Sequence, residues 1–216
     1  MKFSRVISVI VLVLSVIAFS CRKSDSTAPV VSLEGESTMS VVLNGSFTDP
    51  GATAQDNEDG RLNVNVSGTV NPDLAGAYVI KYSATDAAGN TGNAERIVNV
   101  LNSAAFLVGN YAATAYLTAD TVYYQTSLVA STTLNKRVWL PGFAAYSQAV
   151  VYADVHADSL IVPQQDVVFG TPPVTRSFNG KGTEAIIGDS MIIHILFNET
   201  TSGNGNSGVV RFARKL

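Results

Sequence analysis

Few residues in this 216-residue chain have the chemistry of a catalytic or metal site, since it contains two histidines and one cysteine. One histidine belongs to a row in which Tyr152, Asp154, His156 and Asp158 alternate with apolar or small residues. Alternate side chains share one face of a β-strand, so this row can offer metal ligands, or a general base with an orienting carboxylate. It is also the pattern of a solvated strand face. We favour that interpretation, because metal sites usually draw further ligands from other strands.

The remaining signatures of catalysis are weak. His194 stands alone in a very apolar run, which favours a hydrogen-bonded barrel residue over a catalytic one. There is no Gly-x-Ser-x-Gly elbow, phosphate loop or zinc-spaced pair. Glycosidase carboxylates can lie far apart in sequence, but residues 103–216 hold only seven acids. We therefore expect no catalytic residues. A hydrolase that uses Asp154, His156 and Asp158 is the least favoured alternative.

Three aromatic residues are the candidates for ligand binding. Trp139 ends an expected strand, Phe143 follows Pro141-Gly142, and Tyr146 comes shortly after. Aromatic rings beside polar donors can stack on sugar faces or line an apolar pocket. The same rings can be ordinary β-core residues, because large aromatics dominate such cores.

A calcium site is suggested by oxygen donors in two expected loops, namely Asp56, Glu58, Asp59, Asp86 and Asn90. Residues 28–102 carry a net charge of −6, which a divalent cation would offset. Asp and Asn also stabilise turns by bonding to nearby backbone amides. We favour this structural role, because the sequence has no EF-hand loop and does not show that the two acidic turns meet.

Asp followed by Ser or Thr, and then by a small or apolar residue, occurs four times. This pattern resembles the O-glycosylation site of some Gram-negative envelope proteins, and it selects Ser26, Thr121, Ser159 and Ser190. Asp-Ser and Asp-Thr pairs also simply begin turns. Unmodified masses of all four peptides would exclude glycosylation.

The N-terminal residues have the pattern of an export signal. Lys2 and Arg5 precede an apolar run over residues 6–19, which is shorter than a membrane-spanning helix requires. Ala18-Phe19-Ser20-Cys21 resembles a bacterial lipobox. The resemblance implies a signal peptide over 1–20, a lipidated Cys21 and a polar tether over 21–28. An ordinary signal peptide is the alternative. Residue 22, directly after the cysteine, is Arg, so it does not resemble the Asp that retains lipoproteins in the inner membrane. We therefore expect the protein in the outer membrane, on its periplasmic or extracellular face.

Composition restricts the class of protein. The chain is 46% hydrophobic and 14% charged, with a net charge of −3. These values exclude a disordered chain and argue against nucleic acid as a partner, since phosphate binding needs a basic surface. Short β-branched or alternating runs recur between turn residues, which indicates an all-β protein. The charge changes at residues 102–104, because residues 103–216 are neutral overall. We expect a short linker there.

The first module resembles a known family. The characteristic segments are Thr48–Asp56, Glu58-Asp59-Gly60, Gly76-Ala77-Tyr78 and Tyr82–Asn90. Together they are similar to the bacterial Ig-like domain that is repeated on surface proteins and occurs in a pesticidal crystal toxin. The resemblance covers residues 29–101 and implies a Greek-key sandwich of about seven strands. Such modules usually act as spacers or adhesion units.

The second module, residues 105–216, contains Trp139 and six of the eight tyrosines. Its strands are expected near residues 108–118, 121–131, 136–140, 149–155, 158–162, 166–169, 183–188, 190–198 and 207–214. Strands in this number suggest an up-and-down barrel or a sandwich. Val108–Tyr111, Thr132–Trp139 and Val209–Phe212 resemble a lipocalin-like β module.

These observations favour a lipid-anchored, non-catalytic binding protein whose ligand is a glycan. The alternative is a structural or adhesion protein that docks a partner protein on the cell surface. In both cases we expect membrane attachment through the lipid, no nucleic acid and no cofactor other than calcium.

Overall fold

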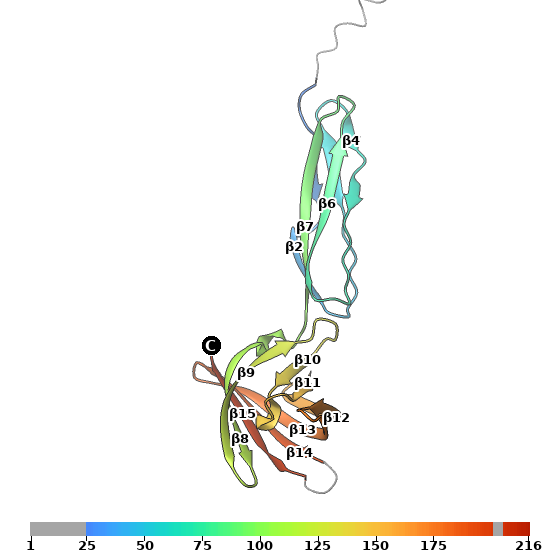
Figure 1. Cartoon of the computed structure of the whole chain (residues 1–216). Coiled ribbons are helices and arrows are strands. Elements are labelled where there is room, and N and C mark those ends of the chain that lie inside the picture. Colours follow the sequence, from blue (N-terminus) through green and yellow to red (C-terminus); the bar gives the residue numbers. More distant parts are fainter. Residues whose placement is uncertain (1–24, 201–204) are drawn as a thin grey trace, which may run out of the picture. The chain divides into compact units, whose positions relative to one another are not determined.

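The computed structural model describes residues 25–200 and 205–216. Within these ranges the chain forms fifteen β-strands and two 3₁₀ turns, η1 (Ala105–Leu107) and η2 (Phe143–Ala145), with no α-helix (Figure 1). Neither of these short turns has the length of a membrane-spanning helix. The all-β fold expected from the recurring strand patterns is confirmed. The signal peptide and Cys21 lie outside the described residues.

The first module consists of two sheets. One has the order β1 (Val30–Leu33), β3 (Ala52–Asp56), β4 (Gly60–Leu62). The other has the order β2 (Thr38–Val42), β7 (Thr91–Leu101), β6 (Gly76–Thr85), β5 (Asn65–Ser67). β2 runs parallel to β7, whereas β1 with β3, β3 with β4 and β5 with β6 are antiparallel. Seven strands in two sheets agree with the Ig-like expectation.

The core of this module follows the period-2 alternation of its longest strands. On β6 the side chains of Ile80, Tyr82 and Ala84 are buried, while the residues between them are at least partly exposed. On β7 the buried positions continue through Val98 and Val100. Since one strand face packs inward and the other meets solvent, the sequence alternation alone is sufficient to place this core.

One buried position on β7 is an arginine. Arg96 has no exposed surface, and its guanidinium donates to Asp49 Oδ1 at 2.7 Å. It also donates to the carbonyl oxygens of Glu34 and Gly51, at 2.6 and 3.0 Å. The Tyr82 hydroxyl donates to the same Asp49 oxygen at 2.7 Å. The Arg96 guanidinium on β7 thus holds the Asp49 carboxylate and the backbone at Glu34 and Gly51 by hydrogen bonds.

Burial raises the pKa of Tyr82 to about 12, and the hydrogen bond to Asp49 acts in the same direction. In the unfolded chain the pKa is about 10. The neutral phenol therefore stabilises the fold fully below pH 10, and this contribution is lost between pH 10 and 12. We expect the urea midpoint to fall across this interval, and to fall less steeply in Tyr82→Phe. Equal slopes would show that Tyr82 does not control alkaline unfolding.

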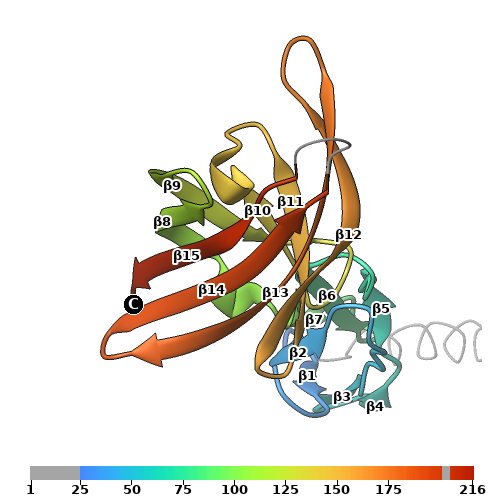
Figure 2. The same ribbon diagram turned by 90° about the horizontal axis from the view of Figure 1, so that it is seen from below.

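The second module is a closed antiparallel barrel, so the choice between barrel and sandwich is resolved (Figure 2). Its strands, in order around the barrel, are β10 (Arg137–Pro141), β11 (Val150–His156), β12 (Ser159–Phe169), β13 (Val174–Ile187), β14 (Ser190–Glu199), β15 (Ser207–Lys215), β8 (Gly109–Leu117) and β9 (Thr121–Ala130). Successive strands pair with one another, as in an up-and-down barrel. β9 and β10 close it.

Side chains fill much of the barrel interior. The largest of them are fully or almost fully buried: Tyr111, Phe143, Phe178, Phe197 and Phe212. Phe143 packs edge-on against Phe178 and Phe197, with ring centroids 5.9 and 5.4 Å apart. Such contacts add to the free energy gained by burying the rings. The barrel interior is therefore packed with side chains and does not form an open central ligand cavity.

By its contacts the chain divides into two compact units. Among the described residues, the first contains 25–37, 49–68 and 80–96, and the second contains 38–48, 69–79 and the remainder from 97 onward. Asp49, Tyr82 and Arg96 all belong to the first unit. The barrel belongs to the second, as does Asn102, which is buried and donates to the carbonyl oxygens of Ser131, Leu134 and Arg137.

Candidate functional site

The Asp-x-His-x-Asp row does not form a cleft. On β11, Val151, Ala153 and Val155 face the core, so Asp154 and His156 face outward. Both oxygens of Asp154 accept hydrogen bonds from Arg137, at 2.7 and 2.8 Å. His156 and Asp158 are exposed, which favours the interpretation as a solvated face. His194 is also exposed, whereas the sequence suggested a hydrogen-bonded barrel position.

The structure does not bring the three predicted ligand-binding aromatics onto one surface. Phe143 is fully buried in the barrel core. Trp139 lies between the inward-facing Val138 and Leu140, so it is on the outer face, where its ring meets Tyr152 edge-on at 5.6 Å. Tyr146 belongs to a separate polar cluster. Of the three, Trp139 is the one that lies on the outer face of a barrel strand.

The polar cluster around Tyr146 is built on a buried carboxylate. Glu199 has a fully buried side chain, and its Oε1 accepts from Arg176 at 2.5 Å. Its Oε2 accepts from the Tyr146 hydroxyl at 2.8 Å, and Asn206 donates to the same hydroxyl at 3.3 Å. Burial raises the pKa of Tyr146, and the neighbouring Glu199 acts in the same direction. These contacts explain the cluster as a structural network.

A cleft of about 480 Å³ lies beside the loop that follows β10. It forms because β9 and β10 pair only through Ala130 with Val138 and Val129 with Trp139. Its lining residues are Val122, Tyr124, Gln125, Thr126, Ser127, Val129, Pro141, Gly142, Ala145 and Ser147. The cleft therefore runs along most of β9 and reaches the segment in which the sequence predicted a ligand site.

The loop on one side of this cleft has strained backbone. Gly142, Ala144 and Ala145 have φ values of 66°, 55° and 67°, in the left-handed region. For alanine this conformation costs about 1–2 kcal/mol per residue. The buried Phe143 ring anchors the loop, and the Gly142 amide donates to the Ala149 carbonyl at 2.7 Å. Strain of this kind is concentrated at binding and catalytic sites.

Tyr124 is the aromatic residue of the cleft. Burial raises its pKa to about 12, and a Cβ added at Gly142 would lie 3.7 Å from its Cε2 atom. The ring therefore lies against the strained loop. Tyr124 is not among the predicted ligand-binding residues, because nothing in its own strand distinguishes it from the other tyrosines. The cleft beside Tyr124 depends on how many residues of β9 and β10 pair with each other.

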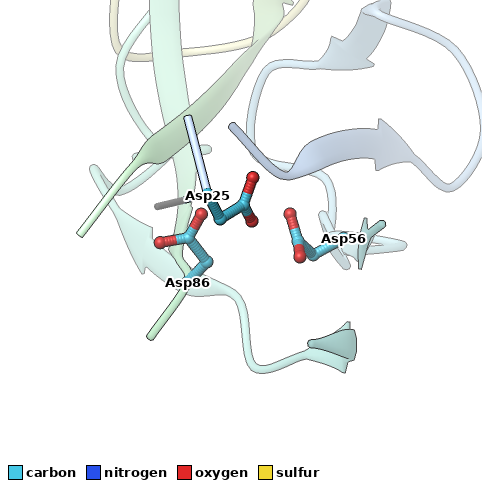
Figure 3. A group of neighbouring side chains, drawn as sticks. All are labelled: Asp25, Asp56 and Asp86. Carbon is cyan, nitrogen blue, oxygen red and sulfur yellow. The ribbon is translucent and has the colours of Figure 1, made fainter. Parts of the chain in front are cut away.

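The two acidic turns of the first module do meet. The carboxylates of Asp25, Asp56 and Asp86 converge, with one oxygen atom of each within 4.8 Å of the others (Figure 3). Asn90 donates its side-chain amide to Asp86 Oδ2 at 2.8 Å and to the Asp25 carbonyl at 3.2 Å. Asp59 instead accepts from the Ala87 amide at 2.6 Å.

Asp25 was expected in the tether, and its isolated position there gave no signal of a site. The pKa of Asp86 is lowered: burial opposes ionisation, but hydrogen bonds from Asn90 and from backbone amides of the turn outweigh it. Asp86 is therefore ionised at neutral pH, as a cation ligand must be.

The predicted glycosylation sites lie at turns or strand starts. Ser26 and Thr121 are exposed, whereas Ser159 and Ser190 are half-buried at the first residues of β12 and β14. The Ser159 hydroxyl donates to the His156 carbonyl. Ser26 and Thr121 are thus the more accessible of the four, and modification stays a prediction.

Residues 31–100 match the family model of the bacterial surface protein Ig-like domain. This agrees with the resemblance that the sequence motifs of the first module carry. No curated protein matches the chain.

Similar solved structures have low identity. A lipoprotein from Bacteroides thetaiotaomicron is 13% identical, with a TM-score of 0.35, over 85% of this chain and 98% of that one. The CBM51-2 and INT domains of Clostridium perfringens ZmpB, in complex with GlcNAc, are 14% identical, with a TM-score of 0.29 and 85% coverage of this chain. A ZmpB structure with the M60 catalytic domain gives 14% and 0.30, over 87% of this chain. The matches span only 43% and 21% of those two longer chains.

Proposed function

We propose that this protein is an outer-membrane, surface-exposed lipoprotein that binds glycan without catalysis. Cys21 carries the lipid, the Ig-like module acts as a spacer, and the barrel binds the ligand in the cleft beside η2. The observation that carries this proposal is the cleft itself, because concave sites of about 300–1,000 Å³ are typical of ligand binding. Its volume of about 480 Å³ falls within that range.

The lining of the cleft suits a sugar. Tyr124, Val122 and Pro141 supply apolar surface on which the C–H face of a pyranose can pack. Gln125 and Ser147 are exposed polar residues at the same cleft. Thr126 already donates to the Pro141 carbonyl at 2.6 Å, which helps to fix the wall of the site. An apolar face with a few polar groups is the usual composition of a specific small-ligand site.

The test is a glycan array, followed by calorimetry on any hit, with residues 21–216 carrying Cys21→Ser for solubility. We expect Ser147→Trp to weaken binding at least tenfold, because Ser147 is exposed at the cleft and an indole there would occupy the space of the sugar. Ile187→Trp is the matched control, since Ile187 is 64% exposed on β13 and outside the cleft. It should change affinity less than twofold.

Trp139→Ala separates the two candidate surfaces. Loss of binding in this variant, with Ser147→Trp unaffected, would move the site to the outer face beside Tyr152. If the folded protein binds no glycan on the array, the glycan proposal fails. The alternative, docking of a partner protein, then becomes the leading hypothesis. It is favoured by exposed apolar side chains on the barrel, since Val168, Ile186 and Leu196 are each more than 60% exposed.

A further inference from the structure

The group formed by Asp25, Asp56 and Asp86 comes from three separate parts of the first unit (Figure 3). Asp25 opens the described chain, Asp56 ends β3, and Asp86 follows β6. Three carboxylates within 4.8 Å of one another repel when ionised. Two of them, Asp56 and Asp86, are only 4% and 7% exposed. Such an arrangement needs a compensating positive charge or a shared proton.

Asp56 provides an independent indication of a ligand. Its Oδ1 accepts from the amides of Glu58 and Asp59, both at 2.9 Å. Its Oδ2 is buried and has no hydrogen-bond partner among the described residues. Leaving a buried carboxylate oxygen without a partner is costly. A cation at the centre of the group would satisfy this oxygen.

Protein groups already hold the other two carboxylates in place. Asn90 donates its backbone amide to Asp86 Oδ1 at 2.8 Å and its side-chain amide to Asp86 Oδ2. The same side chain holds the Asp25 carbonyl, and the Thr27 amide donates to Asp25 Oδ1 at 2.9 Å. Preorganised ligands of this kind are typical of metal sites, where the outer contacts orient the ligand atoms.

No basic side chain of the described residues forms an ion pair with these three carboxylates. In the Ig-like module, the ion pairs within the described ranges are Lys81 with Glu95 and Arg96 with Asp49. The surplus charge also extends beyond the group, because residues 28–102 carry −6 overall. A divalent cation therefore meets both the local and the wider electrostatic requirement.

We propose that Asp25, Asp56 and Asp86 bind one Ca²⁺ ion that attaches the N-terminal segment to the Ig-like module. Calcium binds oxygen at about 2.3–2.6 Å, so opposite ligands can lie about 5 Å apart, whereas magnesium at about 2.0–2.1 Å requires about 4 Å. Ligand atoms within 4.8 Å of one another can therefore all contact one calcium ion. Waters or carbonyl oxygens would complete its shell.

The consequence concerns the membrane anchor, and this step rests on the proposed lipidation of Cys21. Asp25 is four residues after Cys21, a distance that an extended chain spans in about 14 Å. With calcium bound, the Ig-like module would be held within that length of the lipid. Without calcium, residues 25–29 would be released from the module and would lengthen the tether. The site would thus set the spacing between module and membrane.

Calorimetry and thermal unfolding test the proposal, with chelator-treated residues 21–216 carrying Cys21→Ser. We expect one Ca²⁺ per chain, with a Kd on the order of 10⁻⁵–10⁻³ M, and a rise in Tm on the order of 5–10 °C at saturation. Asp25→Asn, Asp56→Asn and Asp86→Asn should each weaken binding at least tenfold. Glu58→Gln is the matched control. It removes one charge from the same turn, outside the group, and should change Kd less than twofold.

Hydrogen exchange reads the attachment directly. Calcium should slow exchange of the amides of residues 26–28 in the parent protein and not in Asp86→Asn. The absence of both heat and a Tm shift at millimolar calcium would overturn the proposal, as would tighter binding of magnesium. Unchanged calcium affinity in Asp25→Asn would overturn the role of the tether. Asp25 lies outside the folded core, so that variant remains informative if the other two fail to fold. None of these readouts depends on glycan binding.

Discussion

Replacing Asp49 by alanine is expected to lower the free energy of unfolding of the Ig-like module by about 3–5 kcal/mol. The substitution removes the carboxylate that pairs with Arg96, whose side chain has no exposed surface. The carbonyl oxygens of Glu34 and Gly51 would still accept from the guanidinium, but its full charge would stay in the core without a counterion. The Tyr82 hydroxyl would lose its acceptor as well.

Urea unfolding, followed by far-UV circular dichroism, measures this loss of free energy. Glu95→Ala is the control, because Glu95 pairs with Lys81 at 3.4 Å with both side chains more than half exposed. Exposed pairs contribute about 0–1 kcal/mol. A loss below 1 kcal/mol in Asp49→Ala would show that the backbone carbonyls alone satisfy Arg96. Asp49→Asn, which keeps an acceptor for Tyr82, separates the loss of charge from the loss of a hydrogen bond.

The network of Asp49, Arg96 and Tyr82 shows which features of the Ig-like module the sequence does not predict. Alternation along residues 76–101 is enough to predict the strands and their buried faces, because one face of each packs inward. Pro50-Gly51 directly after Asp49 is typical of a tight turn, and Gly51 has a φ of 91°. That Asp49 also neutralises Arg96, 47 residues later, depends on how the sheets pack. Local spacing does not encode that contact.

In the barrel, the sequence predicted the strands well except along β12 and β13. Residues 158–162 and 166–169 were expected to be two strands but form one, β12, with a register shift between Val162 and Gln165. The glycine-rich run 179–182 is outside the expected strands, whereas the structure places it inside β13. A Cβ at Gly180 or Gly182 would come within 2.5 Å of a backbone oxygen of β14. Glycine there permits close strand packing rather than a turn.

The candidate sites depend on contacts between distant segments, so the sequence predicted them only in part. Asp56, Asp86 and Asn90 were chosen because their residue types bind hard cations, and the structure places them together. Asp25 was assigned to a tether, because only the fold shows that the N-terminal segment returns to the β3 and β6 ends. In the barrel, the cleft borders the segment 139–146, which contains the predicted ligand-binding residues, but its position depends on the point at which β9 and β10 separate.

The second large effect is expected in the barrel, where Arg176→Ala should lower its free energy of unfolding by about 2–4 kcal/mol. Glu199 has a fully buried side chain, and Arg176, which is 28% exposed, supplies its counterion at 2.5 Å. The Arg176 guanidinium also lies 4.8 Å from the centre of the Tyr146 ring. Without Arg176, the carboxylate would keep the Tyr146 hydroxyl but lose its positive partner. The Tyr146 hydroxyl keeps its acceptor in this variant, whereas the Tyr82 hydroxyl loses its acceptor in Asp49→Ala, so we expect the smaller effect here.

The double variant Arg176→Met with Glu199→Gln distinguishes a buried unpaired charge from a general loss of packing. If the charge is the cause, the double variant should be more stable than Arg176→Ala, because glutamine keeps an acceptor for Tyr146 and carries no charge. Lys215→Ala is the surface control, since Lys215 and Asp189 are both more than two-thirds exposed. It should change stability by less than 0.5 kcal/mol. A double variant as unstable as Arg176→Ala would show that an uncompensated charge on Glu199 is not the cause, and would indicate the contact between the guanidinium and the Tyr146 ring instead.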